Sequence, residues 1–237
     1  MTAGFDPGTR QLLLMNPNTD AAVTALMADI AQTALLGTAA GSPLTVLSHT
    51  ARRGARLITH EAALDESARV LVEDLESIDR SRVAGVIIAA FGDPALRQVR
   101  ALVDVPVTGL AEASMAEAAS IARTASPAGN GRFAVVTTTP ELVSSIEATA
   151  QRYGHQPWFA GVELTPGEPA ALMSDAQALH HAMRQACQRA ITERGATAIV
   201  IGGGPLARVA GALSQQLAVP VIAPIPAAVR RLVAHLR

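Results

Sequence analysis

Four short segments combine Asn, Thr and Gly in a way that suits a binding site for a small anion or imide. They comprise residues 16–19, 90–94, 137–140 and 202–205, and each follows an apolar run and precedes a helical pattern. The N–H groups at the start of a helix can stabilise a carboxylate or imide oxyanion, and Asn and Thr side chains add neutral donors and acceptors. The alternative is that these polar residues only cap helices. We expect the substrate to contact Asn16, Asn18, Thr19, Phe91, Gly92, Thr137, Thr138, Gly203 and Gly204.

Three ionisable residues near these segments are candidate proton carriers. Asp93 and Glu112 each lie at the start of an expected helix, where a carboxylate could act as a general base. The same position also suits a capping role, because a helix N-terminus lowers the pKa of a carboxyl group. His60 precedes another helix, and imidazole is the natural proton carrier near neutral pH, whereas a lone loop histidine is commonly just solvated. The candidate catalytic residues are therefore Asp93, Glu112 and His60.

The residue inventory excludes several classes of chemistry. Lysine is absent from the 237 residues, so no side chain can form a Schiff base and no P-loop can be present. Cys187 is the single cysteine, which excludes a disulfide within the chain and a multi-cysteine zinc or iron–sulfur site. His180 and His181 are adjacent on an expected helix and do not share a face. We expect no metal and no cofactor, and we interpret Cys187 as a helix or core residue.

Composition indicates a globular protein without a strongly charged surface. Hydrophobic residues make up 49% of the chain, charged residues 16%, and the formal net charge is −1. This balance gives no electrostatic reason to expect nucleic acid or an anionic membrane as a partner. The N-terminus carries Asp6, Pro7 and Gly8 rather than the basic and apolar regions of a signal peptide. We expect a cytoplasmic homo-oligomer that binds a small anionic or imide substrate.

Short apolar runs alternate with helical patterns along the chain. Several runs, such as 84–90, are continuously apolar, which is typical of strands that are buried on both faces of a sheet. The alternation predicts an α/β fold with parallel sheets, with helices that include residues 62–75 and 176–193. The expected strands cover residues 11–15, 44–48, 84–90, 105–109, 133–137, 158–164, 198–202 and 219–223.

The chain also repeats itself. Gly-Val-Ile-Ile-Ala-Ala at 85–90 aligns with Ala-Ile-Val-Ile-Gly-Gly at 198–203, and the sequence Val-Pro-Val occurs at both 105–107 and 219–221. Any α/β protein shows some similarity between its strand segments, but here the order and the spacing of the matching segments agree as well. We therefore predict two similar α/β halves that are related by a pseudo-two-fold axis.

Several motifs together resemble the hydantoin racemase branch of the aspartate/glutamate racemase superfamily. They are Asn-Pro-Asn-Thr at 16–19, Phe-Gly-Asp-Pro at 91–94, Gly-Leu-Ala-Glu-Ala at 109–113, Val-Val-Thr-Thr at 135–138 and Gly-Gly-Gly-Pro at 202–205. The similarity covers nearly the whole chain, with the motifs in the right order. As a set they are fairly specific, although each would be weak alone.

The resemblance implies a fold and a chemistry. It implies two domains, each a four-stranded parallel sheet flanked by helices, with the substrate cleft between them. The C-terminal helix would return to the first domain, which gives one domain of residues 1–104 plus 219–237 and another of residues 105–218. The implied reaction takes place at an acidic carbon and needs no cofactor.

The sequence departs from the family at two decisive positions. Racemases of this family use two thiols, one on each face of the substrate carbon, and the matching positions here are Ala90 and Gly203. Neither side chain can move a proton. Racemisation by two thiols is therefore not available to this sequence.

Three functions remain open at this point. The first, which the resemblance favours, is a cofactor-independent isomerase of the racemase or epimerase type. It would act on a small amino-acid-derived acid or a hydantoin-like cyclic ureide through non-thiol proton carriers. The second is a lyase, decarboxylase or hydrolase on the same scaffold, because oxyanion-binding loops can also stabilise a carbanion or enolate. The third is a metabolite-binding protein without catalysis.

Overall fold

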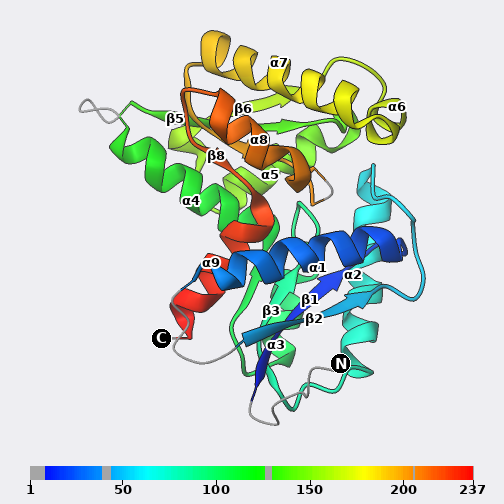
Figure 1. Cartoon of the computed structure of the whole chain (residues 1–237). Helices are drawn as coiled ribbons and strands as arrows, with labels where there is room; N and C mark the ends of the chain where they lie inside the picture. The colour runs from blue at the N-terminus through cyan, green and yellow to red at the C-terminus, as the bar shows by residue number, and fades with distance from the viewer. Residues whose placement is uncertain (1–8, 39–43, 126–129, 205, 237) are drawn as a thin grey trace, which may run out of the picture.

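Two parallel sheets of four strands, covered by helices, form the protein (Figure 1). The computed structural model describes residues 9–38, 44–125, 130–204 and 206–236. Asp6, Pro7 and Gly8 of the N-terminus and Pro205 of the last glycine-rich loop lie outside the described residues. The elements up to the end of the first sheet are β1 (Arg10–Asn16), α1 (Ala21–Leu36), β2 (Leu44–Thr50), α2 (Glu61–Glu76), β3 (Val83–Ile88), α3 (Leu96–Leu102) and β4 (Val107–Gly109).

The second part of the chain repeats this arrangement. Its elements are α4 (Leu110–Thr124), β5 (Arg132–Thr137), η1 (Pro140–Leu142), α5 (Val143–Arg152), η2 (Gln156–Trp158), β6 (Phe159–Leu164), α6 (Pro169–Ser174), α7 (Ala176–Arg194), β7 (Ala196–Ile201), α8 (Ala207–Gln216), β8 (Val221–Ile222) and α9 (Pro224–His235). The strand orders are β2-β1-β3-β4 and β6-β5-β7-β8, and every neighbouring pair is parallel. The predicted α/β fold with two similar four-stranded halves is confirmed.

The central strand β1 is buried on both faces, as a continuous apolar run requires. Leu12 and Leu14 pack into one core cluster, whereas Leu13 and Met15 pack into another on the opposite face of the sheet. The cluster around Leu12 also contains Phe133 of β5. The two halves therefore share one core cluster, and each also has a cluster of its own on the opposite face of its sheet.

Both fourth strands are shorter than the sequence predicted, and proline is the reason in each half. Pro106 and Pro220 have no N–H to donate to a ladder, so β4 and β8 begin only after them. Their carbonyls still accept hydrogen bonds at 2.9 Å, Pro106 from the N–H of Val86 and Pro220 from the N–H of Ile199. The internal repeat thus extends to individual backbone contacts.

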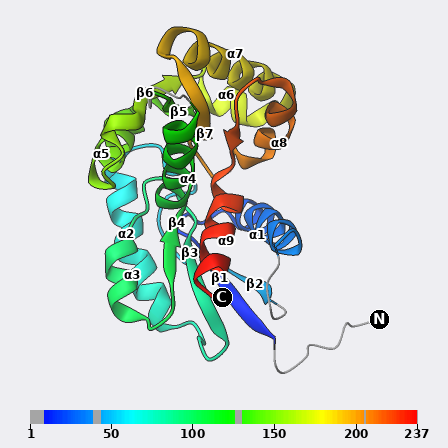
Figure 2. The same cartoon turned by 90° about the vertical axis from the view of Figure 1, so that its left-hand side faces the viewer.

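The expected domain boundaries need correction. The predicted division at 104/105 assigned β4 to the second domain, but β4 pairs with β3 in the first sheet. The division at 218/219 assigned β8 to the first domain, but β8 pairs with β7 in the second sheet. The reason is that each sheet is completed by the fourth strand of its own repeat, and only the helices cross over. α4 leaves β4 and packs on β5 and β7, while α9 leaves β8 and packs on α1, β3 and β4 (Figure 2).

No helix within the described ranges is both long enough and apolar enough to span a bilayer. The helices α2 and α7 agree with the expected ranges 62–75 and 176–193 to within a residue. His60 explains where α2 begins, because its Nδ1 accepts a hydrogen bond from the N–H of Ala63 at 3.2 Å. Asp175 caps α7 in the same way, through the N–H groups of Gln177 and Ala178.

Candidate active site between the two sheets

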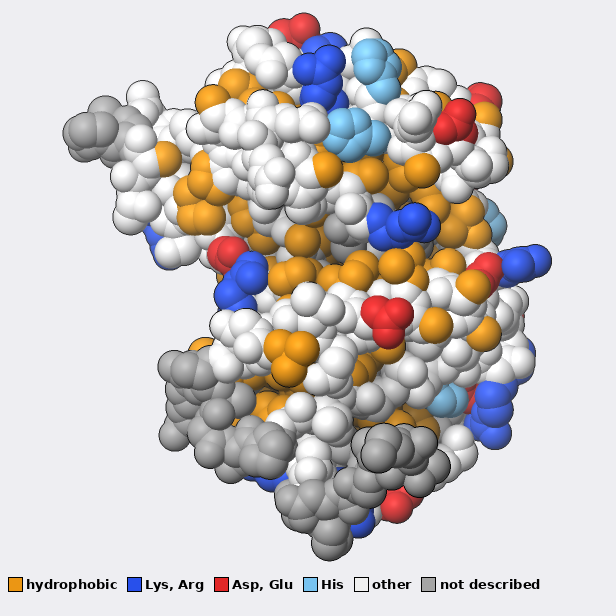
Figure 3. All heavy atoms as spheres, viewed as in Figure 1, with side chains coloured by type: hydrophobic (Ala, Val, Ile, Leu, Met, Phe, Trp, Pro, Cys, Tyr) orange, Lys and Arg blue, Asp and Glu red, His pale blue; other side chains and the backbone are white. Residues whose placement is uncertain are grey.

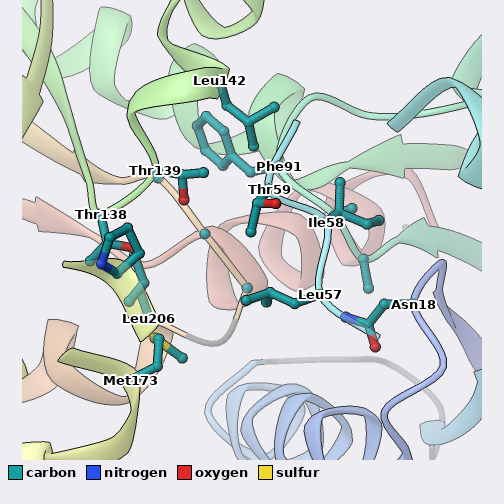
Figure 4. Close-up of a pocket in the computed structure, with 16 residues that line it drawn as sticks. Asn18, Leu57, Ile58, Thr59, Phe91, Thr138, Thr139, Leu142, Met173 and Leu206 are labelled. Atoms are coloured by element: carbon teal, nitrogen blue, oxygen red, sulfur yellow. The ribbon is translucent and has the colours of Figure 1, made fainter. Parts of the chain in front are cut away.

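A cavity of about 80 Å³, partly open to solvent, lies between the halves at the carboxyl ends of their strands. Figure 4 shows Asn18, Leu57 and Ile58 of the first half on one side and Thr138, Met173 and Leu206 of the second half on the other. The lining residues are Asn18, Leu57, Ile58, Thr59, Ala89, Ala90, Phe91, Thr138, Thr139, Leu142, Pro169, Met173, Gly202, Gly203, Gly204 and Leu206. The site thus draws on the loops after β1, β2, β3, β5, β6 and β7.

The rim of this cleft is also apolar. Figure 3 shows hydrophobic side chains gathered in the hollow between the two halves. A surface hollow there is lined by Val23 and Leu26 of α1 together with Leu179 and Val209 of the second half, and it shares Met173 with the cavity. Asp20 and Arg208 also line this hollow, so a ligand that enters from this side meets apolar surface together with one charge of each sign.

The structure brings several of the expected substrate contacts together. Asn18, Phe91, Thr138, Gly203 and Gly204 all line the cavity, although they come from loops that are far apart in the sequence. Ala90, at one of the two positions that match the family thiols, lines it as well. The other expected contacts lie outside the lining, and they are Asn16, Thr19, Gly92 and Thr137.

Asn16 lies behind the cavity wall and holds Asn18 in place. Its side chain is fully buried, and its Nδ2 donates to Oδ1 of Asn18 and to Oγ1 of Thr24, both at 2.8 Å. The Oδ1 of Asn18 also accepts from the N–H of Asp20 at 3.0 Å. Both contacts occupy the oxygen of Asn18, so its Nδ2 is the group turned toward the cavity (Figure 4). Asn16 therefore fixes which end of the Asn18 amide a ligand meets.

Thr137 plays the corresponding part in the second half. Its buried hydroxyl donates to the carbonyl of Gly202 at 2.9 Å, which ties the end of β5 to the glycine-rich loop after β7. A Cβ on Gly202 would lie 2.7 Å from Cγ1 of Val135, and a Cβ on Gly204 would lie 2.7 Å from Sδ of Met27. A Cβ on Gly202 would also meet Cβ of Thr137 and the carbonyl of Val136, so packing requires glycine there, whereas at Gly204 the buried Met27 side chain would have to shift.

The polar groups of the cavity are uncharged. They are the hydroxyls of Thr59, Thr138 and Thr139 and the amide of Asn18, and no lining residue within the described part of the chain carries an ionisable side chain. These groups can donate to a carbonyl or accept from an N–H, but they offer neither a general base nor a counter-charge. The arrangement suits a neutral, partly apolar ligand.

Asp93 lies behind the loop that carries Ala90 and Phe91, not in the cavity. It is 5% exposed, and its carboxylate accepts hydrogen bonds from the N–H groups of Ala111 at 2.8 Å and Glu112 at 2.7 Å. Asp93 thus caps α4 from a distance of many residues along the chain. Burial raises the pKa of this carboxyl to about 6, against the effect of its hydrogen-bond donors.

The other two candidate proton carriers are also committed elsewhere. Glu112 accepts from Nη2 of Arg100 at 2.6 Å and from the hydroxyl of Thr108 at 3.0 Å, and it lines a separate cavity together with Asp93. His60 is exposed and caps α2, although Leu57, Ile58 and Thr59 just before it line the substrate cavity. The geometry therefore brings none of the three candidate side chains into the cavity.

Sequence reasoning missed the loops after the two outer strands. Leu57, Ile58 and Thr59 follow β2, while Pro169 and Met173 follow β6, and all five line the cavity. Their sequences contain no motif that indicates binding. Only the position of these loops indicates binding, because ligands in parallel sheets bind beyond the carboxyl ends of the strands, and both loops follow such an end.

Cys187 is buried in α7, in the core cluster that fills the space between α7 and the second sheet. Burial raises the pKa of its thiol to about 12, so the reactive thiolate is scarce at neutral pH. We expect the native protein to resist alkylation by iodoacetamide at pH 8 and the urea-unfolded protein to react completely, as followed by mass spectrometry. Rapid labelling of the native protein would contradict the buried position.

Within the described ranges, no three side chains of His, Cys, Asp or Glu cluster as a metal site would require. His180 and His181, which are adjacent in the sequence, lie on α7, where Nε2 of His181 is 2.9 Å from Nε2 of Gln185.

Two matching parallel sheets, with a cavity between the carboxyl ends of their strands, define an α/β fold of two similar halves. Residues 12–232 match the family described as Asp/Glu/Hydantoin racemase, and the chain belongs to that family. The resemblance that the sequence motifs indicated is thereby confirmed.

Individual relatives are similar over almost the whole chain. The hydantoin racemase of Paenarthrobacter aurescens is 31% identical over 223 residues, which cover 93% of this chain and 88% of the relative. The solved structure of allantoin racemase from Klebsiella pneumoniae has a TM-score of 0.82 at 31% identity and covers 96% of this chain and 87% of its own. Allantoin racemase from Pseudomonas fluorescens shares the fold, with a TM-score of 0.84 at 24% identity and coverage of 96% and 91%.

Proposed function

We propose that the protein is a cofactor-independent isomerase that inverts the acidic carbon of a neutral, hydantoin-like or allantoin-like cyclic ureide without using thiols. The observation that carries this proposal is the uncharged cavity between the halves, with Ala90 contributed by one half and Gly203 by the other. Relatives that are described as hydantoin and allantoin racemases support the choice of substrate class.

The charge of the site favours a neutral ring over an anionic acid. A carboxylate substrate needs a cation or several N–H donors, and arginine is the usual partner. The arginines nearest to the loop after β2 are already engaged, Arg52 with Asp74 and Arg56 with Asp20, at 2.7 Å and 3.1 Å. A cyclic ureide presents carbonyls and N–H groups that match the Nδ2 of Asn18 and the hydroxyl of Thr138.

The proposed mechanism relies on stabilising the enolate rather than on a strong base. Removal of the proton from the acidic carbon places negative charge on the neighbouring ring oxygen, and donors that are already oriented lower the barrier most at that point. Nδ2 of Asn18 is such a donor, because Asn16 and the N–H of Asp20 hold the other end of the amide. Water in the partly open cavity would carry the proton away and return it to either face.

Decarboxylation is the second candidate. Loss of CO₂ generates an enolate without a general base and then needs only one proton, which solvent can supply. The same absence of an ionisable side chain from the described lining therefore favours this reaction over any that needs two bases. Its substrate would be a cyclic ureide or related compound that carries a carboxyl group on the acidic carbon.

The experiment that tests the proposal is incubation of pure protein in D₂O with enantiopure 5-benzylhydantoin and, separately, with enantiopure allantoin. We expect deuterium at the acidic carbon together with loss of optical rotation, both faster than in buffer alone. Asn18→Ala should slow both signals, whereas Arg194→Gln, which removes an ion pair with Glu163 outside the cavity lining, should not. Saturable binding without exchange would contradict the isomerase, as would CO₂ release from a carboxylated substrate without exchange.

A further inference from the structure

The loop that carries Ala90 and Phe91 is held in a strained backbone conformation. Asp93 has a φ of 57° and Ala95 a φ of 58°, both in the left-handed region that non-glycine residues rarely adopt. Strain of this kind persists only where surrounding contacts hold the backbone in place. One side of this loop faces the substrate cavity, so the contacts on its other side decide where Ala90 and Phe91 lie.

Those contacts come from the second half of the protein. The hydroxyl of Tyr153, at the end of α5, donates to Oδ2 of Asp93 at 2.7 Å, and Nη2 of Arg152 lies 3.5 Å from the carbonyl of Gly92. The ring of Tyr153 packs against the core cluster that both halves share and against a cluster of the first half, and the Arg152 guanidinium lies 5.5 Å from the ring centroid. Figure 2 shows α5 directly above α2, which agrees with the residues of both helices that line the cavity behind the loop.

Tyr153 is therefore an inter-half contact that does not touch the substrate cavity. It lines the cavity behind the loop, with Asp93, Glu112 and Arg152. Asp93 itself is bonded to the first turn of α4, and α4 runs from the first sheet onto the second. A single carboxylate thus joins the cavity loop, the crossing helix and the end of α5.

We propose that the Tyr153–Asp93 hydrogen bond is a positioning contact that sets the spacing of the two halves across the cavity and so places Ala90 and Phe91 relative to Gly203. Without the hydroxyl, Asp93 keeps its bonds to α4 but loses its direct bond to the second half. The halves then sample more open arrangements, and the loops that form the cavity separate. Tyr153 acts through Asp93 and the loop, not on the substrate.

A distance measurement tests this directly. Spin labels on Ala25→Cys of α1 and Gln177→Cys of α7, both at exposed positions, report the separation of the halves across the cleft by pulsed electron resonance, and the buried Cys187 stays unlabelled. Tyr153→Phe keeps the ring and removes only the hydroxyl. We expect a longer and broader distance distribution than in the Tyr153 parent, and about tenfold weaker binding of 5-benzylhydantoin by calorimetry.

The control is Thr197→Val, which removes a hydrogen bond of 2.9 Å to the carbonyl of Arg132 within the second half alone. It should leave the distance distribution unchanged even if it lowers the free energy of unfolding by a similar amount. An unchanged distribution in Tyr153→Phe, equal broadening in Thr197→Val, or failure of Tyr153→Phe to fold would each overturn the proposal. The binding arm rests on the proposed function, but the distance arm needs no substrate, so failure of the one is distinguishable from failure of the other.

Discussion

The double variant Ala90→Cys plus Gly203→Cys should racemise 5-benzylhydantoin at least about 100-fold faster than the wild type, because it places a proton carrier on each half of the cavity. Both positions line the same cavity and come from corresponding loops of the two repeats. A Cβ on Gly203 would lie 3.1 Å from Cδ1 and 3.3 Å from Cγ of Leu206, so the variant requires the Leu206 side chain to shift by a few tenths of an ångström. The measurement is loss of optical rotation, with deuterium exchange in D₂O recorded in parallel.

The single variants are the matched controls. Inversion by thiols needs one thiol on each face. Each single cysteine should therefore raise exchange more than it raises racemisation, which still depends on water to return the proton to the opposite face. A helix N-terminus gives little help to a thiolate at position 90, because α3 begins only at Leu96, beyond the strained loop that follows Ala90. The rate should therefore rise with pH toward the ordinary thiol pKa of about 8.5. A folded double variant that binds 5-benzylhydantoin without any gain would show that the two positions do not face the same carbon.

Gly109→Ala should destabilise the protein by about 2–4 kcal/mol, through overpacking and loss of the cap on α4. A Cβ at this position would lie 2.1 Å from Cγ of Asp93, and the buried carboxylate has no room to retreat without giving up the N–H groups of Ala111 and Glu112. Urea unfolding followed by circular dichroism measures the change in the free energy of unfolding.

Gly211→Ala provides the contrast within the same chain. Gly211 lies inside α8, and a Cβ there meets no atom within 4 Å. The substitution should stabilise the protein by about 0.5–1 kcal/mol, because alanine loses less backbone entropy than glycine in a helix. Equal effects of the two substitutions would contradict the packing that we describe around Asp93.

The fold was predictable from the sequence because its signals are local and repeated. Continuous apolar runs such as the one that contains Leu12 identify buried strands, and the second Val-Pro-Val motif indicates the internal repeat through residue identity alone. The domain boundaries were not predictable in this way. Which sheet a two-residue strand joins depends on pairing at a distance, and β8 contains only Val221 and Ile222.

The candidate site was predictable in position but not in the role of each residue. Asn16 and Asn18 belong to one motif, yet one holds the other and only Asn18 lines the cavity. Asp93 has the residue type and location of a general base, and only the three-dimensional structure shows that Tyr153 and the first turn of α4 use its oxygens. Sequence spacing gives no information about such contacts, because their partners lie far along the chain.

The crossing of α4 and α9 has a consequence for cooperativity. Each sheet is covered by a helix whose preceding strand belongs to the other sheet, and the two crossing helices also pack on each other. If either sheet melted, it would release a helix that the remaining sheet needs and would expose a core that contains both Leu12 and Phe133. Two structural repeats therefore constitute a single thermodynamic unit, which unfolds as a whole even though the cleft between its halves can open.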